Sequence, residues 1–207
     1  MNPRGRFITL EGGEGAGKST AARYIRQWLA ERGREAIVTR EPGGSPLGEA
    51  IRSIVLGEWE ERMPVTAEVL LMFAARAAHM QNTILPALAA GKDVICDRFV
   101  DSTYAYQGCG HGFPESYLQS LEAMVLKNLV PDLTIVFDID PAAGLERTAR
   151  RGEQNRFESE TASFMGRVRQ AFLDRAHAQP GRYAVINAGQ ALDVVQAALA
   201  GVLESRL

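Results

Sequence analysis

GGEGAGKS, at residues 12–19, is the stretch of this 207-residue sequence that decides the fold. It matches the phosphate-loop pattern G-x-x-x-x-G-K-[ST], and it lies between an apolar run, Phe7–Leu10, and a helical pattern, Lys18–Arg32. Glycines let backbone N–H groups converge on an anion without obstruction by Cβ atoms, and the helix N-terminus adds partial positive charge. The stretch therefore predicts a strand–loop–helix unit that binds the phosphates of a nucleoside triphosphate.

The rest of the sequence repeats this alternation of a short apolar run and a longer helical pattern. The runs that predict strands are Phe7–Leu10, Ala36–Thr39, Val94–Cys96, Leu133–Asp138 and Tyr183–Ile186. The patterns that predict helices are Lys18–Arg32, Leu47–Leu56, Ala67–Ala89, Glu115–Leu129, Ala142–Arg150, Glu160–Ala178 and Ala191–Glu204. Because unbroken apolar runs are typical of strands buried on both faces, the sequence predicts an α/β fold with a doubly wound parallel sheet in one domain, residues 1–207. Ligands of such folds gather at the carboxyl ends of the strands.

The composition argues against several classes of protein. A formal net charge of −2 gives no overall field toward nucleic acid or a membrane surface. Two cysteines, Cys96 and Cys109, are too few for a disulfide framework or a zinc site. The sequence shows no signal peptide and no membrane span, so we expect a soluble cytoplasmic protein without nucleic-acid or membrane partners.

Lys18 and Ser19 supply the chemistry of the phosphate loop. A lysine at this position reaches the β and γ phosphates, and a serine hydroxyl suits Mg²⁺. The residues expected to contact ATP are Gly12, Gly13, Glu14, Gly15, Ala16, Gly17, Lys18, Ser19 and Thr20. The guanine-reading pattern Asn-Lys-x-Asp of GTPases does not occur, and the chain is short for a large ATPase, which favours a kinase of a nucleotide, a nucleoside or a small metabolite.

A carboxylate in the phosphate loop and an arginine in an apolar helix indicate an acceptor site. Glu14 places a carboxylate beside a triphosphate, where either a sugar hydroxyl of the acceptor or solvent would face it. Arg76 lies in an apolar helix, where a buried guanidinium needs either a structural carboxylate or a ligand phosphate. Met72 and Phe73 precede it by about one turn, so that either one could flank a base, or both could belong to the core.

Asp97 and Arg98 end the third predicted strand, at the sheet edge where ligands bind. Asp97 is placed to act on the Mg²⁺ shell and Arg98 on a phosphate, although an ion pair at a strand end would give the same pattern. Thr103 and Gln107, if helical, are one turn apart and could read the polar edge of a base together, or face solvent.

The order and spacing of several motifs resemble the thymidylate kinase family over nearly the whole chain. The motifs are E-G-x-E-G-x-G-K-S at 11–19, T-R-E-P-G-G at 39–44, L-x-x-A-A-R ending at Arg76, D-R-F at 97–99, A-Y-Q-G at 105–108, P-D-L-T at 131–134 and R-G-x-x-x-R-x-E at 151–158. The resemblance implies a five-stranded parallel sheet of the P-loop nucleoside monophosphate kinase type, a homodimer, ATP as donor, dTMP as acceptor and Mg²⁺. It also implies a mobile lid near residues 150–158.

The resemblance implies a role for individual residues of the acceptor side. Glu14 would contact the sugar 3′-hydroxyl, and Glu41 would lie by the sugar and phosphate. The phosphate of dTMP would be held or bordered by Arg52, Arg76 and Arg98, and thymine would be addressed by Thr103 and Gln107. The loop has no arginine beside Glu14, which resembles the bacterial type with a catalytic arginine in the lid. Arg151 matches that position best, with Arg147, Arg150 and Arg156 as neighbours.

Three departures from the family pattern leave questions open. Met72 occupies the position of the usual base-stacking phenylalanine, with Phe73 adjacent, so that either residue could cover thymine. His111 replaces an arginine of the glycine loop, which makes a positive charge there dependent on pH, and Asn155 replaces a lid aspartate.

Two other functions remain compatible with the residues, namely a kinase of another acceptor such as dUMP, dCMP or a deoxynucleoside, and a non-catalytic nucleotide-binding switch. The acceptor-side arginines disfavour the switch. For the dimer, apolar helix faces such as Leu118, Leu121 and Val125 with Ala67–Met80 could pair across a two-fold axis or pack within the chain.

Overall fold

A computed structural model describes residues 4–149 and 161–207. Its five strands are all parallel and form one sheet in the order β2-β3-β1-β4-β5. They are β1 (Phe7–Gly12), β2 (Ala36–Arg40), β3 (Asp93–Asp97), β4 (Leu133–Asp138) and β5 (Tyr183–Asn187). The predicted fold class is confirmed, and each predicted strand lies within two residues of an observed one.

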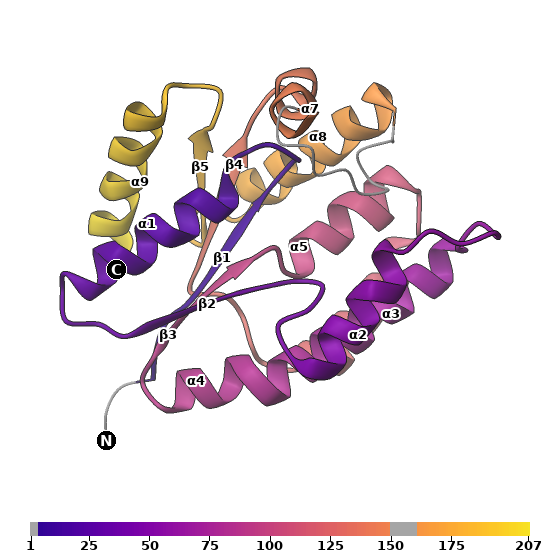
Figure 1. Cartoon of the computed structure of the whole chain (residues 1–207), viewed down its shortest axis with the longest axis horizontal. Helices are drawn as coiled ribbons and strands as arrows, with labels where there is room; N and C mark the ends of the chain where they lie inside the picture. The colour runs from indigo at the N-terminus through magenta and orange to yellow at the C-terminus, as the bar shows by residue number, and fades with distance from the viewer. Residues whose placement is uncertain (1–3, 150–160) are drawn as a thin grey trace.

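Helices cover both faces of the sheet (Figure 1). In chain order they are α1 (Lys18–Ala30), α2 (Pro46–Leu56), α3 (Val65–His79), η1 (Met80–Ile84), α4 (Leu85–Ala89), α5 (Val100–Thr103), η2 (Tyr104–Gly110), α6 (Glu115–Leu126), α7 (Pro141–Ala149), α8 (Ala162–Ala178) and α9 (Leu192–Arg206). The single helix expected at 67–89 contains a wide π-helical segment, η1. Pro86 follows this segment at the start of α4, where its missing N–H and its ring perturb the α-helical hydrogen bonds of the preceding turn. In the described ranges, no helix is both long enough and apolar enough to cross a bilayer.

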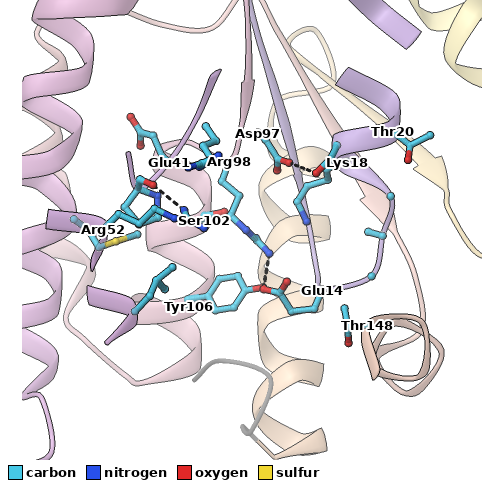
Figure 2. Close-up of a pocket in the computed structure, with 18 of the residues that line it drawn as sticks. Glu14, Lys18, Thr20, Glu41, Arg52, Asp97, Arg98, Ser102, Tyr106 and Thr148 are labelled. Carbon is cyan, nitrogen blue, oxygen red and sulfur yellow. Dashed lines mark hydrogen bonds and ion pairs between the residues drawn. The ribbon is translucent and has the colours of Figure 1, made fainter. Parts of the chain in front are cut away.

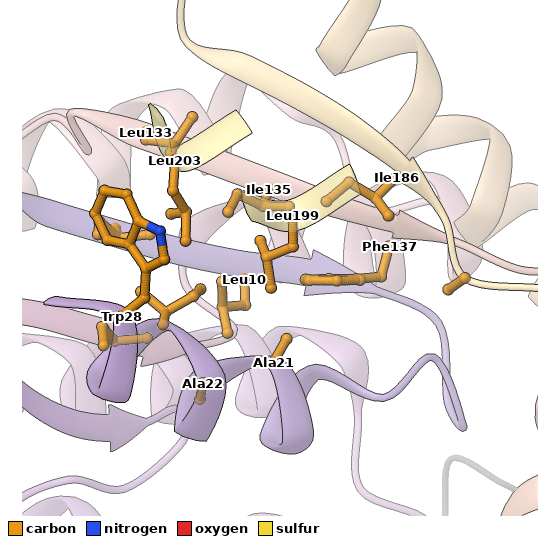
Figure 3. Close-up of a cluster of buried hydrophobic side chains, with 14 of the residues drawn as sticks. Leu10, Ala21, Ala22, Trp28, Leu133, Ile135, Phe137, Ile186, Leu199 and Leu203 are labelled. Atoms are coloured by element: carbon orange, nitrogen blue, oxygen red, sulfur yellow. The ribbon is translucent and has the colours of Figure 1, made fainter. Parts of the chain in front are cut away.

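Side chains of β1 alternate between two apolar layers. Ile8 and Leu10 pack against α1 and α9, as Figure 3 shows for Leu10 with Trp28 and Leu199. Phe7 packs on the opposite face with residues of α3, α4 and α6. Burial on both faces explains why this strand is apolar throughout.

The strand order places the candidate site. After β1 the chain crosses over β3 to form β2, and the later strands β4 and β5 add to the other side of β1. The carboxyl ends of β1 and β3 therefore open at the reversal of strand order, where doubly wound sheets bind ligands.

Candidate active site

The phosphate loop connects β1 to α1, and glycines are required at two of its close contacts. Gly12 has φ +133° and Gly15 has φ +69°; a Cβ atom would lie 2.4 Å from the carbonyl oxygen of Phe137 at Gly12 and 2.1 Å from that of Gly144 at Gly15. Gly17 precedes α1 in a left-handed conformation and provides no side-chain cap. Glycine has no side chain that could cap the helix, and the Thr20 N–H donates to the Gly17 carbonyl oxygen at 3.0 Å. The N–H groups before Thr20, at the start of α1, can therefore bind an anion.

Lys18 is buried in the loop that it serves. Its Nζ donates to the carbonyl oxygens of Gly12 at 3.1 Å and Gly13 at 2.8 Å. Burial lowers the pKa of Lys18 to about 8, and the positive charge of Arg98 adds to the shift. The amine of Lys18 thus lies beside the loop, where a bound anion would favour its protonated form and raise its pKa again.

Ser19 and Asp97, which the sequence assigns to a Mg²⁺ site, are in contact. The Ser19 hydroxyl donates to Asp97 Oδ2 at 2.9 Å. Within the described part of the chain, no group of three or more His, Cys, Asp or Glu side chains forms a candidate metal site. A hydroxyl with one carboxylate fits Mg²⁺, which prefers oxygen ligands and takes the others from phosphates and water.

Arg98 and Glu14 form an ion pair that joins β3 to the phosphate loop (Figure 2). Arg98 has a left-handed backbone, φ +68°, and its Nη2 donates to Glu14 Oε1 at 2.7 Å. The Tyr106 hydroxyl donates to the same oxygen at 3.1 Å. Burial disfavours the charged form of Glu14, but Arg98 and Lys18 outweigh it and hold the pKa of Glu14 below its ordinary value. Glu14 is therefore fixed at the pocket wall, and the solvent-facing alternative is wrong.

Glu11 supports the turn that carries Arg98, and sequence reasoning gave it no separate role. Its carboxylate accepts from the backbone N–H of Phe99 at 2.8 Å and from the Ser102 hydroxyl at 2.6 Å. Burial, reinforced by the charge of Asp101, raises the pKa of Glu11 to about 8. The sequence contained one indication of this role, because Glu11 places a carboxylate directly after the apolar run Phe7–Leu10.

Arg76 is buried against a structural carboxylate, one of the two alternatives in the sequence. Its Nε donates to Glu41 Oε2 at 2.7 Å, and its Nη2 donates to Thr103 Oγ1 at 3.1 Å. His79, which sequence reasoning missed, contacts the other oxygen of Glu41 through Nδ1 at 3.1 Å and Thr39 through Nε2 at 2.7 Å. Nη1 of Arg76 is buried without a hydrogen-bond partner in the described structure.

A cavity of about 480 Å³ joins the phosphate loop to the acceptor side (Figure 2). It is lined by Glu14, Gly15, Ala16, Gly17, Lys18, Ser19, Thr20, Arg40, Glu41, Pro42, Arg52, Leu56, Met72, Asp97, Arg98, Ser102, Tyr106, Gln107 and Thr148. Six of these residues were not predicted for the site: Arg40, Pro42, Leu56, Ser102, Tyr106 and Thr148.

Met72 and Phe73 have different surroundings. Met72 lines the cavity, whereas Phe73 belongs to the apolar core beside Val69 and Phe99. The geometry thus favours Met72 as the side chain next to a bound base. Arg52 also lines the cavity, and its Nη1 donates to the carbonyl oxygen of Pro42 at 2.8 Å. Gly12, Gly13, Arg76 and Thr103 were predicted for the site but lie outside the cavity lining, although Arg76 and Thr103 support it through Glu41.

The predicted lid lies outside the described residues. Arg150, Arg151, Asn155 and Arg156 therefore keep only their sequence-based assignments. Arg147 is described, and its Nη1 donates to the carbonyl oxygen of Ala188 at 2.8 Å. His111 lies with its ring centroid 4.7 Å from that of Phe164.

Comparison with known proteins gives consistent results over the full length. A family model described as "Thymidylate kinase" matches residues 10–199. A "Thymidylate kinase" of Chromohalobacter salexigens is 51% identical, over 100% of this chain and 98% of its own length. One of Pseudomonas entomophila is 52% identical, over 97% of both chains. The crystal structure of thymidylate kinase from Ehrlichia chaffeensis is 33% identical, with a TM-score of 0.78, and the alignment covers 97% of this chain and 99% of that one.

Proposed function

The chain belongs to the thymidylate kinase family, and on that premise we propose how its cavity binds both substrates and promotes phosphoryl transfer. The protein transfers the γ-phosphate of ATP to dTMP and produces dTDP and ADP. The phosphate loop and the acceptor-side residues Arg52 and Gln107 line one cavity. This observation supports the proposal that ATP and dTMP bind there together. Two substrates held there can react directly.

Phosphoryl transfer at this site requires positioning and charge neutralisation more than proton transfer. The nucleophile is a phosphate oxygen of dTMP, which is already anionic at neutral pH, so no general base is needed. Lys18 neutralises the β and γ phosphates, and the N–H groups at the start of α1 bind them. Ser19 and Asp97 would hold Mg²⁺, which supplies further positive charge to the phosphates when bound.

The acceptor nucleotide lies across the other half of the cavity in this proposal. Its phosphate faces Arg52 and Arg98, its 3′-hydroxyl donates to Glu14, and Met72 covers the base. Gln107 forms hydrogen bonds with the polar edge of thymine. Thr103 does not line the cavity; it accepts a hydrogen bond from Arg76 and holds that side chain in place. Arg76 and Glu41 then form the support on which the phosphate and sugar subsites rest.

One assay separates this function from its alternatives. ADP release is measured by a coupled assay with dTMP, dUMP, dCMP, thymidine and no acceptor. We expect the largest kcat/KM with dTMP and no turnover without acceptor. ADP release that is independent of any acceptor would contradict the kinase assignment, and preference for thymidine would move the accepting atom to a hydroxyl, for which Asp97 would have to serve as base.

ATP affinity is expected to fall as pH rises above 8. Lys18 has a pKa of about 8 in the free protein, and a bound triphosphate holds its proton, so that above pH 8 binding requires proton uptake. Affinity should therefore drop by up to about tenfold per pH unit. Calorimetric titration with a non-hydrolysable ATP analogue between pH 7 and 9.5 measures this. Lys18→Arg stays charged and should show a flat profile; an equally steep profile in that variant would exclude Lys18 as the titrating group.

Arg76→Ala is expected to lower the free energy of unfolding as well as dTMP affinity. The substitution removes the partner of the buried Glu41 carboxylate, and such a loss costs about 3–5 kcal/mol. Arg52→Ala is the matched control, because Arg52 is only half-buried and donates to a backbone carbonyl. It should weaken dTMP binding with a change in stability of about 1 kcal/mol or less. Urea denaturation that gives equal stability for both variants would contradict the structural role of Arg76.

We also propose that the protein forms homodimers and works in the cytoplasm. Leu118 is buried within the chain, and Leu121 and Val125 pack partly against the same core, which favours intrachain packing for these three. Leu70 on α3 and Met124 on α6 are exposed instead, on two helices that contact each other, and they would form the centre of a dimer surface. Sedimentation equilibrium of Leu70→Glu, compared with the unaltered protein, tests this: a dimer in both would exclude the surface.

A further inference from the structure

Gln107 is held by a buried carboxylate that has no assigned role. Gln107 lies in η2 and lines the cavity, and its side-chain Nε2 donates to Glu68 Oε1 at 2.5 Å. Glu68 lies in the first turn of α3. Gln107 is 1% exposed and Glu68 is 2% exposed. The amide oxygen of Gln107 is buried and has no hydrogen-bond partner in the described structure.

The contact with Glu68 fixes the orientation of the Gln107 amide. The amide nitrogen of Gln107 donates to a carboxyl oxygen of Glu68, so the amide oxygen faces away from Glu68. The flipped amide would place two acceptor oxygens in contact, and burial makes that repulsion costly because no water separates them. The polar atom of Gln107 that has no protein partner is therefore its amide oxygen, an acceptor, and Gln107 cannot exchange that oxygen for a donor without losing the bond to Glu68.

Pyrimidine bases differ in what they present to such an oxygen. Thymine and uracil carry a proton on N3 and donate from it, whereas N3 of cytosine has a lone pair and its neighbour is an amino group. An amide oxygen held toward N3 therefore pairs with thymine or uracil and opposes the lone pair of cytosine. A ligand that leaves a buried acceptor of the protein without a hydrogen bond binds much more weakly than one that donates to it.

We propose that Glu68 is a positioning residue that sets base specificity, because it locks the Gln107 amide in the orientation that accepts from N3–H and excludes cytosine. This inference rests on the proposed contact between Gln107 and thymine. In this proposal Glu68 does not contact the substrate and acts on the base through Gln107. It does not read the 5-methyl group, so it separates dTMP from dCMP but does not separate dTMP from dUMP.

Glu68→Gln is expected to relax the selection against cytosine. A glutamine at this position can donate or accept, so the Gln107 amide can turn either way and pair with either base. We expect the ratio of kcat/KM for dTMP to that for dCMP to fall about tenfold or more. The ratio for dTMP to dUMP should stay within about twofold. In each measurement the two acceptors compete in one reaction, and chromatography separates the two nucleoside diphosphates that form. The ratio of the products gives the ratio of kcat/KM values, which does not depend on the fraction of active enzyme.

Glu122→Gln is the matched control for the change of charge. Glu122 also accepts a hydrogen bond from η2, from the Tyr104 hydroxyl, but it does not line the cavity. Its substitution should leave both ratios unchanged. Glu68→Met, which removes the acceptor without adding a donor, should shift the dTMP to dCMP ratio in the same direction as Glu68→Gln. If turnover is too low, the ratio of dissociation constants for dTMP and dCMP serves as the readout.

Gln107→Ala separates failure of this inference from failure of the proposed thymine contact. If Gln107→Ala leaves kcat/KM for dTMP within about twofold of the unaltered protein, the thymine contact is wrong and the specificity role of Glu68 falls with it. If Gln107→Ala lowers kcat/KM for dTMP while the Glu68 variants keep the dTMP to dCMP ratio, the contact stands and the role of Glu68 is overturned. Loss of selectivity in Glu68→Gln and Glu68→Met, with Glu122→Gln unaffected, supports the proposal.

Discussion

Replacement of Lys18 by alanine is expected to lower kcat for dTMP phosphorylation by about 10³-fold or more. Removal of one neutral donor from a developing anion costs about 10²–10³ in rate, and Lys18 supplies a full charge in a buried site. The triphosphate gains negative charge at the bridging oxygen during transfer, and Lys18 is the loop residue placed to neutralise it. Steady-state kinetics at saturating ATP and dTMP measures the loss.

Folding should survive this substitution, which makes the kinetic result interpretable. Nζ of Lys18 donates to two carbonyl oxygens of the loop, and among the described residues it forms no ion pair with a carboxylate, so the substitution leaves no carboxylate there without a direct partner. Burial also disfavours the charge of Lys18. We expect a melting temperature close to that of the unaltered protein and little change in dTMP affinity. A kcat within tenfold of the unaltered value, in a folded protein that still binds ATP, would contradict the role of Lys18.

Arg151→Ala is expected to lower kcat by about 10³–10⁵-fold, which is the contribution of an arginine in related phosphoryl transfers. The assignment rests on the sequence, because Arg151 lies outside the described residues. The described part of the cavity gives it physical support: Arg98 is paired with Glu14, and Arg52 donates to the Pro42 carbonyl. Neither is placed by those contacts on the transferred phosphoryl group, so a further arginine is expected to supply that charge.

The neighbouring Arg147 provides the control for Arg151. It donates to the carbonyl oxygen of Ala188, on the connection between β5 and α9, so Arg147→Ala should change kcat far less than Arg151→Ala. Single-turnover measurements at saturating substrate concentrations separate the chemical step from product release. If Arg151→Ala keeps the turnover of the unaltered protein, the assignment is wrong, and Arg150 and Arg156 are the next candidates.

The strands were predictable because their signal is local. A strand buried on both faces must be apolar throughout, and each predicted run corresponds to one strand of the sheet. The helix expected at 67–89 shows the limit of such patterns. Its apolar positions are compatible with an α-helix throughout, whereas the backbone widens at η1 before Pro86, because a proline changes which carbonyl groups find donors in the preceding turn.

The acceptor side was predictable as a set of residues and less so in its arrangement. The sequence contained Arg76 and Glu41, but not the fact that they pair with each other, with His79 on the far side of the carboxylate. It likewise contained Met72 and Phe73 as adjacent candidates. Their separation into wall and core depends on which side of α3 faces the cavity, and that is set by the packing of α3 against α2 and α6.

The sequence by itself determined the phosphate loop, the alternating strands and helices, and the family, because these depend on backbone geometry and on residue types at fixed short spacings. Only the tertiary structure decided which charged and polar groups meet. Glu14 and Arg98 are 84 positions apart, Glu68 and Gln107 are 39 apart, and each pair forms because strand order and helix packing bring distant segments together. A charge in a sequence has no partner until the fold supplies one, and burial then makes the choice of partner decisive, because an unpaired charge away from water is too costly to keep.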